Sequence, residues 1–336
     1  MRIVRTDREL RLPGVDAALR AAGHDLVLLP DGVGEAALAE AAGEADILMM
    51  CYTPVTARVI EGASRLRGIV KYGVGIDAID IAAARARGIV VVNVPDYADA
   101  TVAEAAFALM LALAKRLPAL QRRMEGAGWV WPEPHWIGRD IAGSTVGVVG
   151  LGRIGRRFAG MARAFGAAVI AVDPAIGAAE MARLGVERID GLTGLMARSD
   201  FVSLHAVLKP DTHHLIGAAE LDAMKPTAFL INTARGALVD AVALIRALDA
   251  GRIAGAGLDV FESEPLARRG HALSPLYGRD NVILTPHLAF HTEEAMARLE
   301  REALARVAEL AEGRPVRIRS SDPRLAGQAG AIYDPG

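Results

Sequence analysis

The chain contains little cysteine, few aromatic residues and almost no net charge. Cys51 is the only cysteine among 336 residues, which excludes an internal disulfide framework and a metal site built from several cysteines. It lies in an apolar run, so we interpret it as a small core residue. The formal net charge of −2 leaves no basic surface for nucleic acid or an acidic membrane.

Long apolar runs and targeting patterns are also missing. Although 52% of the residues are hydrophobic, no uncharged apolar run reaches the roughly 18 residues of a membrane span. The N-terminal residues MRIVRTD lack the basic-then-apolar order of a signal peptide. We therefore expect a cytoplasmic protein with no membrane partner. Its length allows two domains, each with its own core.

One stretch, residues 145–173, organises the chain. Thr145–Val149 is a short β-branched and apolar run typical of a buried strand, and the glycine-rich sequence GLGRIG follows it at once. Apolar residues then recur at helical spacing. Ala168–Val172 is a second buried strand, and it ends on Asp173. The pattern predicts a strand–turn–helix–strand unit with an acid at its end.

The three glycines of the turn have separate roles in a dinucleotide site. Gly150 allows the tight turn, Gly152 lets the backbone approach a pyrophosphate, and Gly155 lets the helix pack near the strand. Free N–H groups at the start of the helix then face the phosphates. A glycine-rich turn also occurs in α/β sheets that bind nothing. The complete unit around this turn nevertheless predicts a dinucleotide site.

The acid at the end of the unit indicates which dinucleotide binds. Asp173 lies 18 residues beyond Gly155, where its carboxylate can accept hydrogen bonds from the adenosine ribose diol. A carboxylate there repels a 2′-phosphate, and Pro174-Ala175 offers no arginine to bind one. NAD is therefore the expected cofactor, in preference to NADP.

The segments on either side of this unit also alternate between strands and helices. Alternation over residues 1–96 predicts a second parallel sheet covered by helices, and its turn Gly73-Val74-Gly75 lacks the third glycine of a nucleotide site. The expected strands of this part are Leu26–Leu29, Ile47–Cys51, Ile69–Tyr72 and Ile89–Val92. Beyond Asp173 four more strands are expected, at Phe201–Leu204, Ala228–Asn232, Gly255–Asp259 and Val282–Thr285. With the first two they make a six-stranded, doubly wound dinucleotide domain.

Two helices are expected to connect the domains. One begins at Thr101 and continues past Pro118 to Met124, and the other covers Thr292–Glu312. Between the first helix and the glycine unit lies a loop, residues 126–143, that holds all three tryptophans: Trp129, Trp131 and Trp136. Such a loop suits an interface or a pocket rim, although the rings can also simply anchor the loop.

Three chemically active side chains follow the last three predicted strands. Arg235, Glu264 and His287 should all lie at the sheet edge that carries the glycine turn, because ligands bind beyond the carboxyl ends of parallel strands. An arginine can bind a substrate carboxylate, a histidine can exchange a proton, and a carboxylate can hold the imidazolium and raise its pKa. Each residue alone is more simply a surface or turn residue. Their common placement favours a catalytic set.

These motifs resemble the D-isomer-specific 2-hydroxyacid dehydrogenase family. The resemblance rests on GLGRIG at 150–155, Asp173, and four further motifs: KYGVGIDAID at 71–80, NTARG at 232–236, GLDVFESEP at 257–265 and TPHLAF at 285–290. It implies two doubly wound parallel-sheet α/β domains, with a Rossmann NAD domain at 99–290 inserted in a discontinuous, flavodoxin-like substrate domain at 1–98 plus 291–336. It also implies a homodimer joined through the NAD domain, and the tryptophan loop would suit that interface.

The resemblance carries residue roles with it. Arg235, Glu264 and His287 would be catalytic, and Asp259 would contact the nicotinamide amide. The implied cofactor-binding set is Gly150, Gly152, Arg153, Ile154, Gly155, Asp173, His205, Thr233, Ala234, Arg235, Asp259 and His287. The implied substrate-binding set is Lys71, Val74, Gly75, Arg235 and His287. Backbone groups of Val74 and Gly75 would bind the substrate carboxylate.

Within the family, the chain most resembles the subgroup that contains the phosphoglycerate dehydrogenases and the C-terminal-binding-protein type. Ala98 stands where phosphoglycerate dehydrogenases usually carry an asparagine near the substrate, Ala206 stands where they often carry a threonine near the cofactor, and their C-terminal regulatory extension is not seen. Lys71 keeps a cation where an arginine is frequent. The departures count against 3-phosphoglycerate as the substrate.

The remaining histidines give no expected metal site. His213 and His214 read as solvated loop residues, and His291 could touch substrate through its closeness to His287. No pair at ligand spacing on one element has a third partner in the sequence, so we expect no metal.

The resulting hypothesis is reversible hydride transfer between NAD(H) and a small D-2-hydroxy or 2-oxo acid, with His287 as the proton donor. One alternative is an NAD-sensing scaffold of the C-terminal-binding-protein type with little or no turnover. A second is a dehydrogenase for another acid, such as formate.

Overall fold

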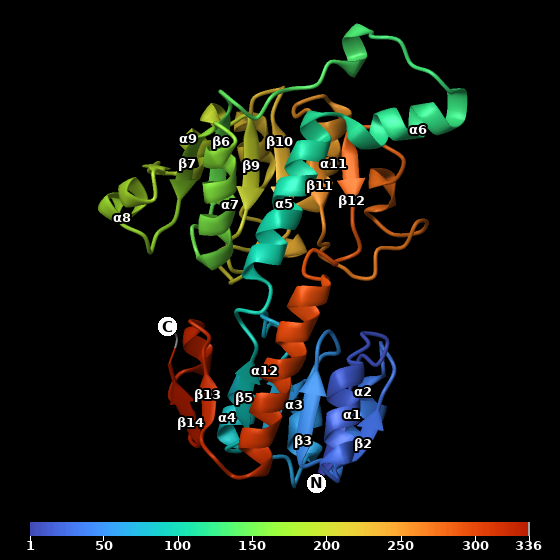
Figure 1. Cartoon of the computed structure of the whole chain (residues 1–336), viewed down its shortest axis with the longest axis vertical. Coiled ribbons are helices and arrows are strands. Elements are labelled where there is room, and N and C mark those ends of the chain that lie inside the picture. The colour runs from blue at the N-terminus through green and yellow to red at the C-terminus, as the bar shows by residue number, and fades with distance from the viewer. Residues whose placement is uncertain (335–336) are drawn as a thin grey trace. The chain divides into compact units, whose positions relative to one another are not determined.

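A computed structural model describes residues 1–334. The chain divides into two compact units (Figure 1). Unit 1 comprises Met1–Ala98 and Thr292–Gly336, and unit 2 comprises Asp99–His291. Both units are α/β, and each holds one fully parallel sheet. No helix of the described residues is long and apolar enough to cross a membrane.

Unit 1 is built on a five-stranded sheet in the order β2-β1-β3-β4-β5. This is the strand order of flavodoxin-like folds. The strands are β1 (Arg2–Arg5), β2 (Asp25–Leu28), β3 (Ile47–Met50), β4 (Gly68–Lys71) and β5 (Val90–Asn93). The helices that cover them are α1 (Pro13–Ala21), α2 (Glu35–Gly43), α3 (Ala57–Gly62), α4 (Ile81–Ala86) and α12 (Glu293–Ala311). Because α12 packs on α1, β3 and β4, the C-terminal segment completes the first unit.

The sequence pattern does not predict β1 or α1, although β1 is an inner strand of this sheet. The reason is its charged flanks. Arg5 is only 1% exposed, and its guanidinium donates to both carboxylate oxygens of Asp16 on α1, at 2.9 Å each. A buried arginine is tolerated because it is paired and hydrogen-bonded, which a local pattern cannot reveal.

The tail of the chain is docked on unit 1. It forms β13 (Val316–Ile318), the 3₁₀ turn η4 (Pro323–Leu325) and β14 (Ala331–Tyr333), with the two strands parallel. The Gln328 side chain accepts from the Val91 amide at 2.7 Å and donates to the Val91 carbonyl at 2.8 Å. It thus replaces a neighbouring strand at the sheet edge. The described part of the tail is therefore fixed to unit 1.

Unit 2 holds seven parallel strands in the order β12-β11-β10-β9-β6-β7-β8. From β6 outward this is the dinucleotide-binding order, with the reversal of strand order between β6 and β9. The strands are β6 (Thr145–Val149), β7 (Ala168–Val172), β8 (Glu187–Arg188), β9 (Phe201–Leu204), β10 (Phe229–Asn232), β11 (Gly255–Leu258) and β12 (Val282–Leu284). The predicted fold class is confirmed. The short edge strand β8 was not expected.

Two apolar cores lie on the two faces of this sheet. One contains residues of α5 and α7, and the other contains residues of α9, α10 and α11. The helices of the unit are α5 (Asp99–Ala114), α6 (Leu117–Ala127), α7 (Arg153–Ala164), α8 (Ala178–Arg183), α9 (Leu192–Arg198), α10 (Ala218–Ala223) and α11 (Ala241–Asp249). Three 3₁₀ turns add η1 (Pro134–Trp136), η2 (Gly236–Leu238) and η3 (Ser274–Leu276).

The prediction of one long helix continuing past Pro118 is wrong. The chain leaves α5 after Ala114, and Arg116 takes a left-handed conformation with φ 53° before α6 begins. Proline has no backbone N–H to donate inside a helix, so Pro118 lies in the first turn of α6, where no donor is needed. In Figure 1, α6 extends away from the sheet of unit 2, and the chain after it loops back to β6.

Candidate active site

The glycine turn is shaped by contacts within unit 2 and leaves one side open. Gly150 has φ 91°, and a Cβ there would lie 2.8 Å from the Ala206 amide nitrogen. A Cβ on Gly155 would lie 2.1 Å from the Gly150 carbonyl oxygen, so α7 can approach β6 only with glycine at this position. A Cβ on Gly152 would meet no atom within 4 Å. Gly152 therefore stands where the backbone faces free space, beside the start of α7.

Asp173 is oriented toward the same turn. One carboxylate oxygen accepts from the Leu151 amide at 2.7 Å and the other accepts from the Ala175 amide at 2.8 Å. Each oxygen keeps a further acceptor position, which a ribose hydroxyl can use. The next two predicted cofactor residues differ in surroundings. Arg153 pairs with Asp99 at 3.1 Å, whereas Ile154 is partly buried against the core of α5 and α7.

His205 lies behind the glycine turn, at the end of β9. Its Nε2 is 2.9 Å from the Ser203 hydroxyl, and its ring packs on Phe158 with centroids 5.0 Å apart. Burial lowers the pKa of His205 to about 3, so the ring is neutral near pH 7. A Cβ on Gly155 would lie 3.5 Å from the His205 Cβ. In the structure, then, His205 supports the turn from within the fold.

Arg235 is carried by a turn that Asn232 holds closed. The Asn232 side chain accepts from the Ala234 amide at 3.0 Å and donates to the Arg235 carbonyl at 2.9 Å. Beside it, Thr233 is 7% exposed, and its hydroxyl finds no hydrogen-bond partner among residues 1–334. An unpaired hydroxyl is costly to bury, so Thr233 is suited to meet a polar group of a ligand.

The Arg235 turn and the Glu264 loop are in backbone contact. A Cβ on Gly236 would lie only 1.9 Å from the Phe261 carbonyl carbon and 2.2 Å from the Glu262 nitrogen. Glycine is required there because the two loops touch directly. Farther along the second loop, the Phe261 amide donates to Glu264 at 2.8 Å. The backbone contact between the two loops therefore fixes the positions of Arg235 and Glu264 relative to each other.

His287 and Glu264 form a hydrogen-bonded pair. Nδ1 of His287 lies 2.8 Å from a Glu264 carboxylate oxygen, and each side chain is about 30% exposed. Burial tends to raise the pKa of Glu264, but the bond and charge of His287, the Phe261 amide and the charge of Arg235 together lower it below its ordinary value. Glu264 is thus an ionised acceptor for the imidazole, and Nε2 is the ring nitrogen that Glu264 leaves to other partners.

Asp259 stabilises the turn at residues 285–289, which carries His287. Its carboxylate accepts from the Thr285 hydroxyl at 2.6 Å, the Leu288 amide at 3.0 Å and the Ala289 amide at 2.9 Å. The carbonyl of Asp259 accepts from the His287 amide at 2.8 Å, where His287 has the left-handed φ of 57°. A left-handed non-glycine residue is uncommon and persists only where its surroundings fix it. Asp259 is 1% exposed, its amide donates to the Asn232 carbonyl at 3.0 Å, and its carboxylate bonds are with this turn.

In unit 1 the predicted substrate loop leaves β4 at Lys71. Lys71 is 6% exposed, its Nζ donates to the Cys51 carbonyl, and it lies 5.6 Å from the centre of the Tyr52 ring. Within the described residues, no carboxylate forms an ion pair with it. Burial raises the pKa of the Cys51 thiol, as the interpretation of Cys51 as a core residue requires.

Beyond Lys71, Val74 is 38% exposed and Gly75 is partly exposed. The Val74 carbonyl accepts from Asn93 at 2.6 Å, which fixes the loop to the end of β5. In the part of the chain that the structure describes, the amides of Val74 and Gly75 have no protein acceptor. They are therefore suited to bind an anionic oxygen.

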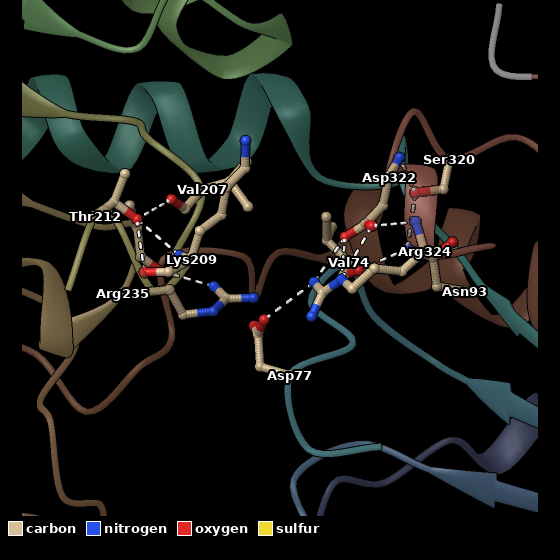
Figure 2. Close-up of polar contacts among 11 residues, drawn as sticks. Val74, Asp77, Asn93, Val207, Lys209, Thr212, Arg235, Ser320, Asp322 and Arg324 are labelled. Carbon is tan, nitrogen blue, oxygen red and sulfur yellow. Dashed lines mark hydrogen bonds and ion pairs between the residues drawn. The ribbon is translucent and has the colours of Figure 1, made fainter. Parts of the chain in front are cut away.

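The docked tail reaches this same loop, a contact that sequence reasoning missed. Figure 2 shows Arg324 pairing with Asp322 at 2.7 Å and with Asp77 at 3.2 Å. Asn93 also contacts the Ser320 hydroxyl at 3.5 Å. The sequence gives no local signal for the contacts of Arg324 with Asp77 and of Asn93 with Ser320, because these partners lie more than 200 residues apart.

Three other histidines have defined surroundings. His291 is exposed, and its ring packs edge-on against Phe290 with centroids 5.8 Å apart. His213 and His214 were expected to be solvated, and their side chains are 50% and 36% exposed. The sequence did not indicate that both rings also lie against Glu262, which is 48 residues beyond His214.

Comparisons with known proteins identify the family. The family model described as D-isomer specific 2-hydroxyacid dehydrogenase, NAD binding domain, matches residues 107–289. The chain belongs to the D-isomer-specific 2-hydroxyacid dehydrogenase family. The predicted family is thereby confirmed, and so is NAD as the cofactor.

Three relatives show how broad the likeness is. A D-3-phosphoglycerate dehydrogenase of Methanocaldococcus jannaschii is 42% identical over 259 residues, which cover 77% of this chain and 48% of the relative. A glyoxylate reductase of Korarchaeum cryptofilum is 41% identical, with 78% of each chain covered. The crystal structure of a D-lactate dehydrogenase from Aquifex aeolicus, complexed with NAD and lactic acid, has a TM-score of 0.83 at 30% identity, covering 93% of this chain and 96% of that one.

These relatives are named for different acids, and the phosphoglycerate dehydrogenase and the glyoxylate reductase are almost equally similar to this chain, at 42% and 41% identity. The chain also spans only about half the length of the phosphoglycerate dehydrogenases that it matches. Sequence similarity therefore leaves the substrate to be argued from the site residues.

Proposed function

We propose that this chain transfers hydride between NAD(H) and a small D-2-hydroxy or 2-oxo acid, with Arg235, Glu264 and His287 as the catalytic residues. The observation that carries the proposal is the 2.8 Å pair of His287 and Glu264, held beside the Arg235 turn at the end of the parallel sheet that bears the glycine turn. Such a pair is an acid–base device, and the arginine supplies a fixed positive charge.

The residues of unit 2 fit the bound cofactor. The open side of Gly152 at the start of α7 suits a pyrophosphate, Asp173 suits a ribose diol, and the unpaired Thr233 hydroxyl suits a polar group farther along. Arg153, Ile154, Ala234 and Asp259 complete the proposed cofactor set, with His205 supporting the turn. When bound, NADH supplies the hydride.

His287 would protonate the substrate oxygen during reduction and accept the proton during oxidation. Nδ1 faces Glu264, so Nε2 is the nitrogen that would carry this proton. The ionised Glu264 accepts the hydrogen bond of Nδ1 and would keep the ring in one orientation. Arg235 would bind the carboxylate and polarise the carbonyl group of the substrate.

Unit 1 is proposed as the substrate domain and unit 2 as the NAD domain. The amides of Val74 and Gly75 would bind the substrate carboxylate, with the buried cation of Lys71 adding positive charge near the loop. This donor set favours a compact 2-oxo acid. The alanines at positions 98 and 206 count against 3-phosphoglycerate.

A homodimer and a cytoplasmic location complete the proposal. The segment from α6 to Ile137 exposes several large apolar side chains, which suits contact with a second copy. They are Leu117, Met124, Trp129, Trp131 and Ile137. The free buried thiol of Cys51 suits a reducing compartment.

A substrate panel tests the proposal. NADH oxidation would be followed with glyoxylate, hydroxypyruvate, pyruvate and bulkier 2-oxo acids, and NAD⁺ reduction with formate. Turnover on at least one 2-oxo acid is expected. Tight NADH binding with no turnover on any acid would instead favour the NAD-sensing scaffold, and turnover on formate alone would favour a formate dehydrogenase.

A further inference from the structure

Two histidines and a glutamate gather on unit 2 outside the residues assigned to catalysis. His213 and His214 stack with ring centroids 4.0 Å apart. Nε2 of His213 lies 3.4 Å from a Glu262 carboxylate oxygen, and Nε2 of His214 lies 3.2 Å from the same oxygen. One ligand atom from each of the three residues lies within 4.8 Å of the other two.

We propose that His213, His214 and Glu262 form a binding site for Zn²⁺. A tetrahedral zinc ion with bonds of about 2.0–2.2 Å to nitrogen and oxygen separates its ligand atoms by roughly 3.3 Å. Both imidazole-to-carboxylate distances match this separation. Two imidazoles and one carboxylate are a common zinc ligand set that leaves a fourth position for water, and the three side chains are 36–50% exposed to solvent.

The two loops that carry the ligands are held in place without a metal. Figure 2 shows the Thr212 hydroxyl bonded to backbone groups of Val207 and Lys209, which closes the turn before His213. The His214 amide donates to the Ala237 carbonyl at 2.8 Å, and His214 takes a left-handed φ of 51°. A site on rigid loops needs little reorganisation to bind its ion.

The backbone of Glu262 is fixed in the same way, because Gly236 packs directly against it. Glu262 also stands two residues before Glu264 on one loop. Zinc bound by Glu262 would therefore act on the loop that carries Glu264, one member of the catalytic pair. We expect bound zinc to lower the rate of hydride transfer. This effect on the rate rests on the proposed function, whereas the binding of zinc does not.

The same contacts also fit a simpler interaction, in which protonated histidines pair with Glu262. Zinc binding distinguishes the two. The full-length, untagged chain would be freed of metal with a chelator and titrated with Zn²⁺ by calorimetry near pH 7.5. We expect the cluster to bind one zinc ion per chain. The affinity for this ion should be at least tenfold weaker in the double variant His213→Asn/His214→Asn and in Glu262→Gln.

Two controls separate this cluster from other histidines. His135→Asn removes an exposed histidine that lies 3.3 Å from Glu133, and should leave zinc affinity unchanged. His287→Asn removes the catalytic histidine and should keep the assigned binding event. The proposal is overturned if wild type binds no zinc, or binds it no better than the variants of the cluster. If zinc still inhibits turnover in the double variant His213→Asn/His214→Asn, the proposed effect of this cluster on catalysis is wrong, while zinc binding by the cluster is unaffected.

Discussion

The geometry of the site depends on a few residues whose neighbours leave no alternative. Gly236, next to Arg235, packs directly against the backbone of the loop that carries Glu264. The hydrogen bonds of Asp259 hold His287 in a left-handed conformation. Both constraints act on backbone position. Small displacements of either loop would change the positions of Arg235 and His287, which we propose act on one substrate.

Gly236→Ala should therefore impair catalysis. The new Cβ would lie 1.9 Å from the Phe261 carbonyl carbon, so one of the two loops must move. Misplacement of catalytic groups by about 1 Å can cost roughly 100-fold in rate, and we expect a loss of kcat/KM of that order. Gly160→Ala on α7 is the matched control, because its Cβ meets no atom within 4 Å. Steady-state kinetics of both variants provide the measurement, and equal activities would contradict the argument.

His205 should make the stability of unit 2 sensitive to acid. Its pKa is about 3 in the folded chain, below the ordinary 6.5, so the unfolded chain binds the proton first as pH falls. Its contribution is complete above pH 6.5 and is lost as pH falls from 6.5 toward 3. Between pH 7.5 and 5, wild type should lose up to about 2 kcal/mol of unfolding free energy relative to His205→Gln. Urea unfolding at both pH values measures this difference, which should vanish if His205 titrates normally.

Among elements, the docked tail has the clearest functional consequence. It satisfies the edge of β5 through Gln328, and it reaches the substrate loop through Arg324 and Asp77. The tail thereby fixes a loop whose amides are proposed to bind the substrate.

Arg324→Ala should raise the KM for the 2-oxo acid severalfold and leave the KM for NADH within about twofold, because the substituted side chain contacts only unit 1 in the structure. Arg314→Ala serves as the control, since that exposed arginine pairs with Glu312 at the start of the same tail. An equal rise in both KM values would indicate general destabilisation in place of a loop effect.

Elements with a complete local pattern were predictable from the sequence. The glycine turn, its flanking strands and the three side chains after β10, β11 and β12 all depend on residues that are close in the chain. Elements whose stability comes from distant partners were not. Strand β1 depends on the pairing of Arg5 with Asp16, and the break before α6 depends on a left-handed arginine that has no sequence signature.

The same distinction holds for the site. Arg235, Glu264 and His287 could be nominated because strand ends share one edge of a parallel sheet. The cluster of Glu262 with His213 and His214 could not, because a pair of adjacent loop histidines gives no hint of a carboxylate about 50 residues away. Asn93 and Arg324 were missed for the same reason.

At the scale of the whole molecule, the segment from α6 to η1 bears on assembly. Trp129 and Trp131 are 71% and 73% exposed, and their rings contact each other with centroids 6.3 Å apart. Exposed large rings on a projecting segment favour a protein interface.

Trp129→Ser/Trp131→Ser should therefore weaken the homodimer. Light scattering of the wild type should give twice the chain mass of 35.4 kDa, and the double variant should shift toward the single-chain mass on dilution. Ile332→Ser removes an exposed apolar residue of the tail and should change nothing. A wild-type mass of 35.4 kDa would refute the dimer. If the double variant is as dimeric as wild type, the two tryptophans do not contribute to the dimer interface.

The central claim is that the chain reduces a 2-oxo acid with His287 as the proton donor. The most direct measurement compares wild type with His287→Ala on the best acid of the panel, together with NADH affinity by fluorescence titration. The account predicts that kcat falls at least 100-fold while the dissociation constant for NADH changes less than threefold. Near-normal turnover of His287→Ala would contradict it.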